Sequence, residues 1–248
     1  MKTVIITGGT KGIGAEIARK FLHDGWQVLI AARNNSGLAL ENRKNLKYKQ
    51  AELKIESDHV ALVKTALEWT GTLNCYINCA GISRWSEVAA VDETFWDDMM
   101  NINVRGTFWG CKTAAANLKP GGSIINISSL AGKRGSANNS VYCASKFGVN
   151  GITQSLAKEL GPREIRVNAV CPVYVETPGL EEALGNPASP PRGQTTAKYL
   201  EEFTRLNAAL QRLPKESEVA DLCIYLASDY ASAITGQCIN VDCGVLPQ

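Results

Sequence analysis

The chain has 248 residues, of which 45% are hydrophobic and 20% charged, and its formal net charge is +2. This charge gives no argument for a nucleic-acid or membrane-surface partner, and without an apolar run of about 18 residues no membrane span is expected. The eight cysteines show no Cys-x-x-Cys spacing and the two histidines lie far apart. We therefore expect reduced core cysteines and no metal site.

The beginning of the chain predicts a dinucleotide site. Residues 3–7 form a β-branched apolar run typical of a buried strand, and residues 15–22 follow with helical periodicity. Because this predicted strand begins so close to the first residue, no signal peptide is expected. Between them stands the turn Gly8-Gly9-Thr10-Lys11-Gly12-Ile13-Gly14. A glycine-rich turn lets the backbone approach a pyrophosphate, and the N–H groups of the following helix can bind it. The alternative is a flexible turn without a ligand.

The end of the second predicted strand, residues 27–32, indicates which dinucleotide binds. An acidic residue there would bind the ribose 2′-hydroxyl and repel a 2′-phosphate, but the chain continues Ala32-Arg33. Lys11 in the glycine turn is a second cation near the same place. Two cations without a carboxylate favour NADP(H) over NAD, although both side chains could simply be solvated surface charges.

Strands and helices continue to alternate along the rest of the chain. Further strands are predicted at 46–53, 73–78, 123–128, 164–170 and 237–241, and helices at 57–70, 92–118 with a break near 101–103, 141–160, 199–210 and 216–227. Residues 178–198, rich in proline, are expected to be a mobile segment rather than a core element. The alternation predicts one α/β domain over residues 1–248, a doubly wound, Rossmann-like parallel sheet of about seven strands.

Tyr142 and Lys146 stand one helical turn apart, so their side chains share a face. A nearby ammonium, together with an oxidised nicotinamide, would lower the phenol pKa from its reference value of about 10. Such a phenol could donate a proton to a carbonyl oxygen or accept one from an alcohol. By itself the pair could equally be an exposed helix pair. The catalytic interpretation is favoured because the other candidate segments also fall at carboxyl ends of predicted strands, where doubly wound sheets bind ligands: Gly8–Gly14, Arg33, Asn78–Gly81, Ser129 and Cys171–Thr177.

Taken together, these motifs resemble those of the short-chain dehydrogenase/reductase family along nearly the whole chain. The family's Thr-Gly-x-x-x-Gly-x-Gly is matched by residues 7–14, its Asn-Asn-Ala-Gly by residues 78–81 and its Tyr-x-x-x-Lys by residues 142–146. The family's catalytic Asn and Ser fall on Asn103 and Ser129, the latter thirteen residues before Tyr142. Each motif is short, but the set is specific.

The resemblance implies a role for each catalytic candidate. Tyr142 would be the general acid for carbonyl reduction or the base for alcohol oxidation, and Lys146 would lower its pKa and hold the nicotinamide ribose. Ser129 would position the substrate oxygen, and Asn103 would hold a water that links Lys146 to solvent. The implied cofactor contacts are Gly8, Thr10, Lys11, Gly12, Ile13, Gly14, Arg33, Asn78, Ala80, Gly81, Tyr142, Lys146, Val175 and Thr177, the last on the carboxamide.

The chain departs from the family pattern at four places. Cys79 replaces the second Asn of Asn-Asn-Ala-Gly, and Val173 follows Pro172 where the family usually has Gly. Cys243 replaces a glycine in Asp242-Cys243-Gly244, and Glu52-Leu53 stands in place of an Asp-hydrophobic pair. None of these changes removes a catalytic group, so the enzyme interpretation is kept.

The resemblance also implies a substrate lid near 178–212, in which residues 186–191 look like an insertion. The candidate substrate residues are Arg84, Trp85, Asn139 and Tyr174, together with Lys133 and Arg134. Three of these side chains are cations, which leaves an anionic or polar substrate open, but all of them could equally face solvent.

The main expectation is a cytoplasmic, NADPH-dependent oxidoreductase that interconverts a small ketone or aldehyde and an alcohol. One alternative is a 3-oxoacyl carrier-protein reductase, and another is a catalytically silent NADPH-binding regulator. The intact set of Asn103, Ser129, Tyr142 and Lys146 argues against the regulator. By analogy with the family, a homotetramer or homodimer built through the helices at about 103–118 and 142–160 is expected, with no nucleic-acid or membrane partner.

Overall fold

The computed structural model describes residues 2–35 and 43–247. It contains a seven-stranded sheet in which every neighbouring pair of strands is parallel, with the order β3-β2-β1-β4-β5-β6-β7. The doubly wound sheet predicted from the sequence is thereby confirmed. The strands are β1 Thr3–Thr7, β2 Gln27–Ala32, β3 Leu46–Gln50, β4 Cys75–Asn78, β5 Ser123–Ile127, β6 Arg166–Pro172 and β7 Cys238–Val241.

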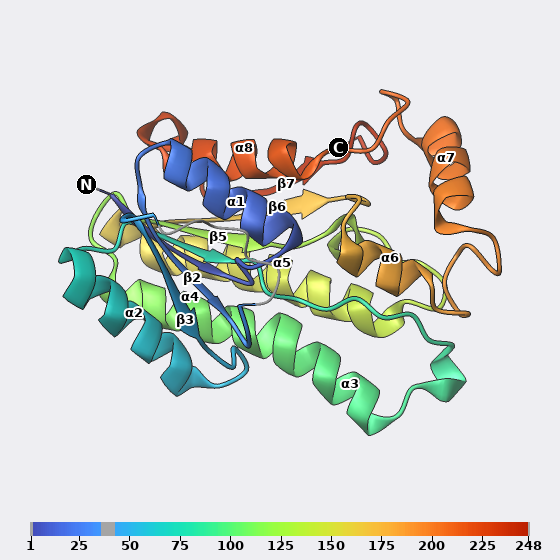
Figure 1. Ribbon diagram of the computed structural model, residues 1–248, viewed down its shortest axis with the longest axis horizontal. Coiled ribbons are helices and arrows are strands. Elements are labelled where there is room, and N and C mark those ends of the chain that lie inside the picture. The colour runs from blue at the N-terminus through green and yellow to red at the C-terminus, as the bar shows by residue number, and fades with distance from the viewer. Residues whose placement is uncertain (1, 36–42, 248) are drawn as a thin grey trace.

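Helices cover both faces of the sheet, as Figure 1 shows. α1 and α8 lie over one face, where Phe21 and Leu226 belong to one buried cluster, and α2, α4 and α5 lie over the other, where Leu62 and Cys111 belong to a second. The helices are α1 Gly12–His23, α2 Glu56–Thr70, α3 Glu93–Met100, α4 Gly106–Asn117, α5 Ser140–Leu160, α6 Pro178–Leu184, α7 Thr196–Asn207 and α8 Glu216–Ala227.

The burial of the strands explains their sequence pattern. Every residue of β1, β4, β5 and β6 is buried, because helices cover both faces, and these strands are accordingly largely apolar, although they also bury polar residues such as Asn126 and Arg166. The edge strand β3 is only partly buried and ends at Gln50 rather than at residue 53. Thr7, Asn78 and Asn126 are paired in register across β1, β4 and β5. The candidate site therefore begins from one aligned edge of the sheet.

The long helical stretch predicted at 92–118 is divided where a break was expected. α3 and α4 are joined by a π-helical turn at Asn101–Arg105, and Gly106 follows it. At Gly106 a Cβ atom would lie 2.8 Å from the carbonyl oxygen of Leu53, so the close approach of the start of α4 to the segment between β3 and α2 requires glycine. π-Turns inside helices occur frequently at functional sites, and this one carries Asn103.

The segment 178–198 differs from its prediction, because part of it belongs to the core. Thr177 caps α6 by accepting a hydrogen bond from the backbone N–H of Leu180 at 3.2 Å, and Pro178 occupies the first helical position. Ala183, Leu184 and Ser189 are buried, and α7 begins at Thr196 rather than at residue 199. In Figure 1, α6 and α7 project beyond the sheet at the end where the strands finish.

Candidate active site

The beginning of α5 places Tyr142 and Lys146 at the carboxyl end of β5. Lys146 is buried, and its ammonium donates a hydrogen bond of 2.9 Å to the carbonyl oxygen of Ile127, the last residue of that strand. The Lys146 Nζ atom lies 5.7 Å from the centre of the Tyr142 ring. The spacing of four residues has thus brought both side chains to one face of the helix, as the sequence predicts.

Burial dominates the electrostatics of Tyr142 and Lys146. Burial raises the pKa of Tyr142 to about 12, while a hydrogen bond with Ser129 acts in the opposite direction. Burial lowers the pKa of Lys146 to about 8. Desolvation of the phenolate therefore outweighs the opposing effect of the Ser129 hydrogen bond on the phenol pKa. Tyr142 is a protonated phenol over the whole neutral pH range.

Ser129 is held beside Tyr142 by its own local turn. Its hydroxyl accepts a hydrogen bond from the N–H of Ala131 at 3.1 Å and lies 3.5 Å from the carbonyl oxygen of Pro172, at the end of β6. Because this hydroxyl also hydrogen-bonds to Tyr142, the two oxygens lie together at the end of the sheet. A carbonyl oxygen placed between them would meet two hydroxyl donors.

Asn103 connects the π-helical turn to the same site. Its side-chain amide exchanges two hydrogen bonds of 2.9 Å with the backbone of Ile82 and donates a third, of 3.1 Å, to the Ser145 hydroxyl. A Cβ atom at Gly81 would lie 3.2 Å from Asn103 Oδ1 and 3.6 Å from Lys146 Nζ. The side chains of Asn103 and Lys146 therefore both lie next to Gly81. The side-chain amide of Asn103 is hydrogen-bonded to other groups of the fold. Its predicted role of holding a water for a proton relay stays a prediction.

The side chain of Asn78, one of the predicted cofactor contacts, is hydrogen-bonded within the core. The Asn78 amide donates a hydrogen bond of 2.9 Å to Asn126, whose own amide donates one of 2.9 Å to Thr153. This buried chain runs into the core between β4, β5 and α5, so the Asn78 side chain is occupied there. Sequence reasoning missed Thr7, whose hydroxyl accepts hydrogen bonds from the N–H groups of Cys79 and Ala80, at 3.1 and 3.3 Å. A polar residue ending an apolar strand beside the glycine turn was the available signal.

The glycine turn lies directly against this segment. A Cβ atom at Gly14 would overlap the carbonyl oxygen of Gly8, and a Cβ atom at Gly8 would lie 2.9 Å from Ala80 Cα. Gly12 has a left-handed φ of +52°, and its own Cβ position lies 3.4 Å from Thr177. The turn therefore has no room for side chains at Gly8 and Gly14, and the left-handed φ of Gly12 disfavours one there, which leaves the backbone accessible to a ligand.

The residues around the turn fit a nicotinamide dinucleotide. The first turn of α1 contains no acidic residue, and the side chain of Lys11 does not cap the helix, so these N–H groups can bind a pyrophosphate. Lys11 and Arg33 are exposed and form no ion pair within the described residues 2–35 and 43–247. Val175 is buried in the core beneath the site. These features match the donors that the pyrophosphate of a nicotinamide dinucleotide needs.

The candidate substrate residues fall into different environments. Arg84 is exposed and forms an ion pair of 3.0 Å with Asp98, whereas Trp85 is buried. Asn139 is buried directly before α5, and its side-chain oxygen has no hydrogen-bond partner in the described part of the chain. The hydroxyl of Tyr174 lies 3.3 Å from that of Tyr199 on α7.

The departures from the family pattern are accommodated in the fold. Val173 packs against the cluster that contains Leu130 and Cys243. Cys243 is buried with a left-handed φ of +54°, the region that favours the glycine it replaces. Cys79 is partly buried, and burial raises its thiol pKa to about 12. All eight cysteines are free thiols in the structure.

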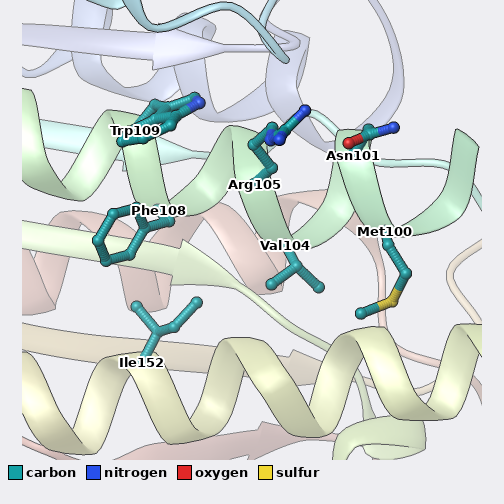
Figure 2. Close-up of a pocket in the computed structure, with 7 residues that line it drawn as sticks. All are labelled: Met100, Asn101, Val104, Arg105, Phe108, Trp109 and Ile152. Carbon is teal, nitrogen blue, oxygen red and sulfur yellow. The ribbon is translucent and has the colours of Figure 1, made fainter. Parts of the chain in front are cut away.

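A surface groove of about 370 Å³ lies between α5 and the joined helices α3 and α4. Figure 2 shows Val104 and Phe108 turned toward Ile152 across it. The groove contains none of the predicted catalytic residues. No helix in the described residues is long and apolar enough to cross a membrane.

Comparison with known proteins identifies the family. A family profile described as enoyl-(acyl carrier protein) reductase matches residues 8–246. The trans-4-hydroxycyclohexanecarboxylate dehydrogenase of Sinomonas cyclohexanicum is 34% identical over 98% of this chain and 92% of its own length. The 3-oxoacyl-(acyl-carrier-protein) reductase of Thermotoga maritima is 32% identical over 99% of this chain and 98% of its own.

A solved structure agrees with these relatives. An actinorhodin polyketide ketoreductase variant with NADPH superposes with a TM-score of 0.89 at 30% identity and covers 98% of this chain and 97% of its own. The family profile, the relatives and the shared sheet lead to one conclusion: the chain belongs to the short-chain dehydrogenase/reductase family, whose members are nicotinamide-dependent oxidoreductases.

Proposed function

We propose that this protein is an NADPH-dependent reductase of a ketone or aldehyde. The observation that carries the proposal is the pair of hydroxyls of Ser129 and Tyr142 at the carboxyl end of the sheet, with the ammonium of Lys146 one helical turn away. This arrangement offers two donors to one oxygen atom and a cation to stabilise the negative charge that develops on it. The glycine turn lies on the same edge of the sheet.

In the proposed reaction, Ser129, Tyr142 and Lys146 act on the oxygen of the substrate carbonyl. Ser129 and Tyr142 hold the carbonyl oxygen by hydrogen bonds, and Lys146 provides the nearby positive charge. The nicotinamide supplies, when bound, the hydride that reduces the carbonyl carbon. As the oxygen gains negative charge its basicity rises, and Tyr142 transfers its proton to it. The Tyr142 pKa of about 12 favours this direction, because the phenol is protonated at neutral pH, whereas alcohol oxidation needs the phenolate.

The preference for NADPH rests on Lys11 and Arg33. Both cations are exposed near the place where a ribose 2′-phosphate would lie, and Ala32 ends β2 without an acidic side chain. The actinorhodin ketoreductase variant was solved with NADPH. NADPH should therefore stabilise the protein at a far lower concentration than NADH, by about 2.7 kcal/mol at 100 times its dissociation constant. Equal stabilisation by NADH would contradict this preference.

A second candidate function is reduction of a 3-oxoacyl group carried by an acyl carrier protein. It is favoured by the relative from Thermotoga maritima, which carries that name, and by the description of the family profile. The relative from Sinomonas cyclohexanicum instead points to a small hydroxy acid. Assaying an acyl thioester beside small ketones separates the two. The intact catalytic set argues against a silent regulator.

We also propose that the protein is a homotetramer or homodimer joined through α4 and α5. The groove in Figure 2 lies between these helices, and Phe108 on its border is 41% exposed. A solvent-exposed aromatic beside an apolar groove is a surface that a second copy would cover. Light scattering of the protein and of a Phe108→Asp variant tests this, and a monomer at all concentrations would contradict it.

The experiment that tests the function compares the parent protein with Tyr142→Phe in NADPH oxidation with a panel of ketones and aldehydes. We expect the substitution to lower kcat by about 10²- to 10⁴-fold, the usual contribution of a general acid. NADPH affinity, measured by fluorescence titration, serves as the control and should change little. A parent protein that turns over no carbonyl would favour the silent regulator.

A further inference from the structure

His59 is a buried histidine that the proposed reaction does not use. It lies near the beginning of α2 and is 1% exposed. Its Nε2 atom lies 2.8 Å from the carbonyl oxygen of Leu53, and its Nδ1 atom lies 2.7 Å from the hydroxyl of Tyr76 on β4. The imidazole therefore joins α2 to β4 and to the segment that follows β3.

The partners of this ring fix its tautomer. A carbonyl oxygen can only accept a hydrogen bond, so Nε2 carries the proton that is donated to Leu53. Burial lowers the pKa of His59, and this effect outweighs those of the hydrogen bond with Leu53 and of two nearby carboxylates. The ring is therefore neutral at pH 7, and Nδ1 accepts the hydrogen bond from the hydroxyl of Tyr76. Burial raises the pKa of the Tyr76 phenol, which keeps this hydroxyl a donor.

His59 supplies the hydrogen bond that the carbonyl group of Leu53 needs. Leu53 is buried, and among residues 2–35 and 43–247 no other group donates to its carbonyl oxygen. On α4, which lies beside α2 in Figure 1, a Cβ atom at Gly106 would lie 2.8 Å from the same oxygen, so the helix backbone leaves little space around it. Without the imidazole, a buried carbonyl group would lose its partner, which is unfavourable.

The residues before Leu53 are held by their backbone as well. The N–H of Ala51 donates to the carbonyl oxygen of Ala32, the last residue of β2, at 3.0 Å. The N–H of Glu52 donates to Asp58 Oδ2 at 2.7 Å. Asp58 and His59 are consecutive residues of α2, and together they determine the path of the chain after β3.

This segment borders the place proposed for the adenosine half of the cofactor. It follows β3 at the carboxyl edge of the sheet, where doubly wound folds bind their ligands. The bond between Ala51 and Ala32 places it beside Arg33, the residue proposed to bind the ribose 2′-phosphate. A nucleotide with its phosphate at Arg33 would therefore have its adenosine next to this segment.

The orientation of one peptide group depends on the imidazole. The peptide bond between Leu53 and Lys54 is trans, so the N–H of Lys54 points away from His59 when the carbonyl group of Leu53 points toward it. Lys54 is exposed, and its N–H forms no hydrogen bond within the described part of the chain. His59 thus leaves an unused backbone donor on the exposed side of the segment.

We propose that His59 is a positioning residue for the cofactor: its hydrogen bond from Nε2 to the carbonyl oxygen of Leu53 fixes residues 51–54 as a wall of the adenosine site and raises the affinity for the adenosine half of NADPH. Tyr76 orients the ring by donating to Nδ1. This inference rests on the proposed function, because it concerns the cofactor of the same reaction. It concerns cofactor binding and not the proton transfer, since these residues lie outside the catalytic set.

The test measures the binding of adenosine 2′,5′-bisphosphate, which carries the adenosine and the 2′-phosphate of NADPH without the nicotinamide, by titration calorimetry. We expect His59→Leu, which cannot donate to Leu53, to raise the dissociation constant of this ligand by about tenfold, which corresponds to about 1.4 kcal/mol. The dissociation constant of NADPH should rise by a similar factor, whereas kcat at saturating NADPH should change by less than about twofold.

A matched pair of polar variants isolates the hydrogen bond to Leu53. The amide nitrogen of a glutamine can reach the position of the imidazole Nε2, whereas that of an asparagine reaches only the position of Nδ1. His59→Gln should therefore keep the affinity for the bisphosphate within about threefold of the parent, and His59→Asn should lose about tenfold. Ala66→Gly weakens the same helix two turns further on and should leave the affinity unchanged.

Nuclear magnetic resonance of the ¹⁵N-labelled protein observes the tautomer directly. The chain contains two histidines, so the imidazole resonances that remain in the variant His23→Gln belong to His59. We expect a neutral ring at pH 7 with its proton on Nε2. A proton on Nδ1 at this pH would overturn the inference. Tyr76→Phe keeps the bond to Leu53 and should weaken binding of the bisphosphate by less than about threefold.

The outcomes separate this inference from the proposed function. If His59→Leu and His59→Asn bind the bisphosphate as tightly as the parent, or if kcat falls while both affinities are unchanged, the inference is overturned and the reductase function stands. If His59→Leu does not fold, the comparison of His59→Gln with His59→Asn decides. If no carbonyl compound consumes NADPH but binding of the bisphosphate depends on His59, the proposed function fails and the inference stands. If the parent binds neither ligand, both fail.

Discussion

The catalytic edge of the sheet and the lid beyond it are held in place by different means. At the edge, Lys146 and Asn103 are buried and hydrogen-bonded to backbone groups of β5 and of the segment after β4. In the lid, α7 buries only Leu200 and is held by the ring contacts of Tyr199 and Phe203. The edge thus uses polar contacts inside the core, and the lid uses a few aromatic contacts near the surface.

The two regions should differ in how well they tolerate substitutions. A substitution at the edge leaves buried polar groups without partners, which costs stability as well as chemistry. A substitution in α7 removes few buried contacts, so it should cost little stability. We infer that the reaction type is fixed by the edge and the substrate choice by the lid.

Gly14→Ala should abolish the binding of NADPH. The new Cβ atom would overlap the carbonyl oxygen of Gly8, so the glycine turn cannot keep its shape. We expect the NADPH dissociation constant to rise by more than about 100-fold, measured by fluorescence titration. Gly161→Ala, where a Cβ atom meets nothing within 4 Å, is the matched control. Unchanged NADPH binding in Gly14→Ala would show that the turn does not hold the cofactor.

Asn103→Ala should destabilise the fold by about 2–4 kcal/mol, because it removes both bonds to Ile82 and the bond to Ser145 and leaves buried polar groups unpaired. Urea unfolding of the parent and the variant measures the difference. A loss of activity with unchanged stability would instead assign Asn103 to the reaction alone.

Carbonyl reduction should slow down as the pH rises above about 8. The pKa of Lys146 is lowered to about 8 from its ordinary value of 10.5, so its ammonium is lost above that pH. We expect kcat/KM to fall about tenfold per pH unit. Between pH 8 and 10.5 the unfolded chain binds more protons at this lysine than the folded one, so its contribution to stability rises there and unfolding does not explain the decline. A flat profile up to pH 10 would contradict the role of the ammonium.

Tyr199→Phe in the lid should change the free energy of unfolding by less than about 1 kcal/mol. The ring contacts remain, and only the hydroxyl contact with Tyr174 is lost. Urea unfolding under the same conditions as for Asn103→Ala gives the comparison directly. A cost as large as that of the edge variant would show that the lid is as tightly integrated as the edge.

Local patterns predicted most of the fold and much of the site. The order of strands and helices, the glycine turn and the Tyr142–Lys146 pair follow from periodicity and short motifs, because each depends on residues close together in sequence. The signal for α6 was also present, since Thr177 followed by Pro178 is a typical helix start, but the prolines after it suggested a loop without core residues.

Other features depend on contacts between distant segments. The Asn78 side chain turns toward Asn126 because β4 and β5 are neighbours, which no local pattern states. The raised pKa of Tyr142 comes from burial, which the spacing of Tyr142 and Lys146 does not reveal.

The most direct test of the central claim is the transfer of an isotope label. The protein is incubated with a carbonyl substrate and NADPH deuterated at C4 of the nicotinamide, in separate reactions for the two faces of the ring, and the alcohol product is analysed by mass spectrometry. We expect deuterium at the carbinol carbon with one of the two labelled cofactors, and a product yield at least about 100-fold lower with Tyr142→Phe. Alcohol without deuterium from either cofactor, or equal yields with the two proteins, would contradict it.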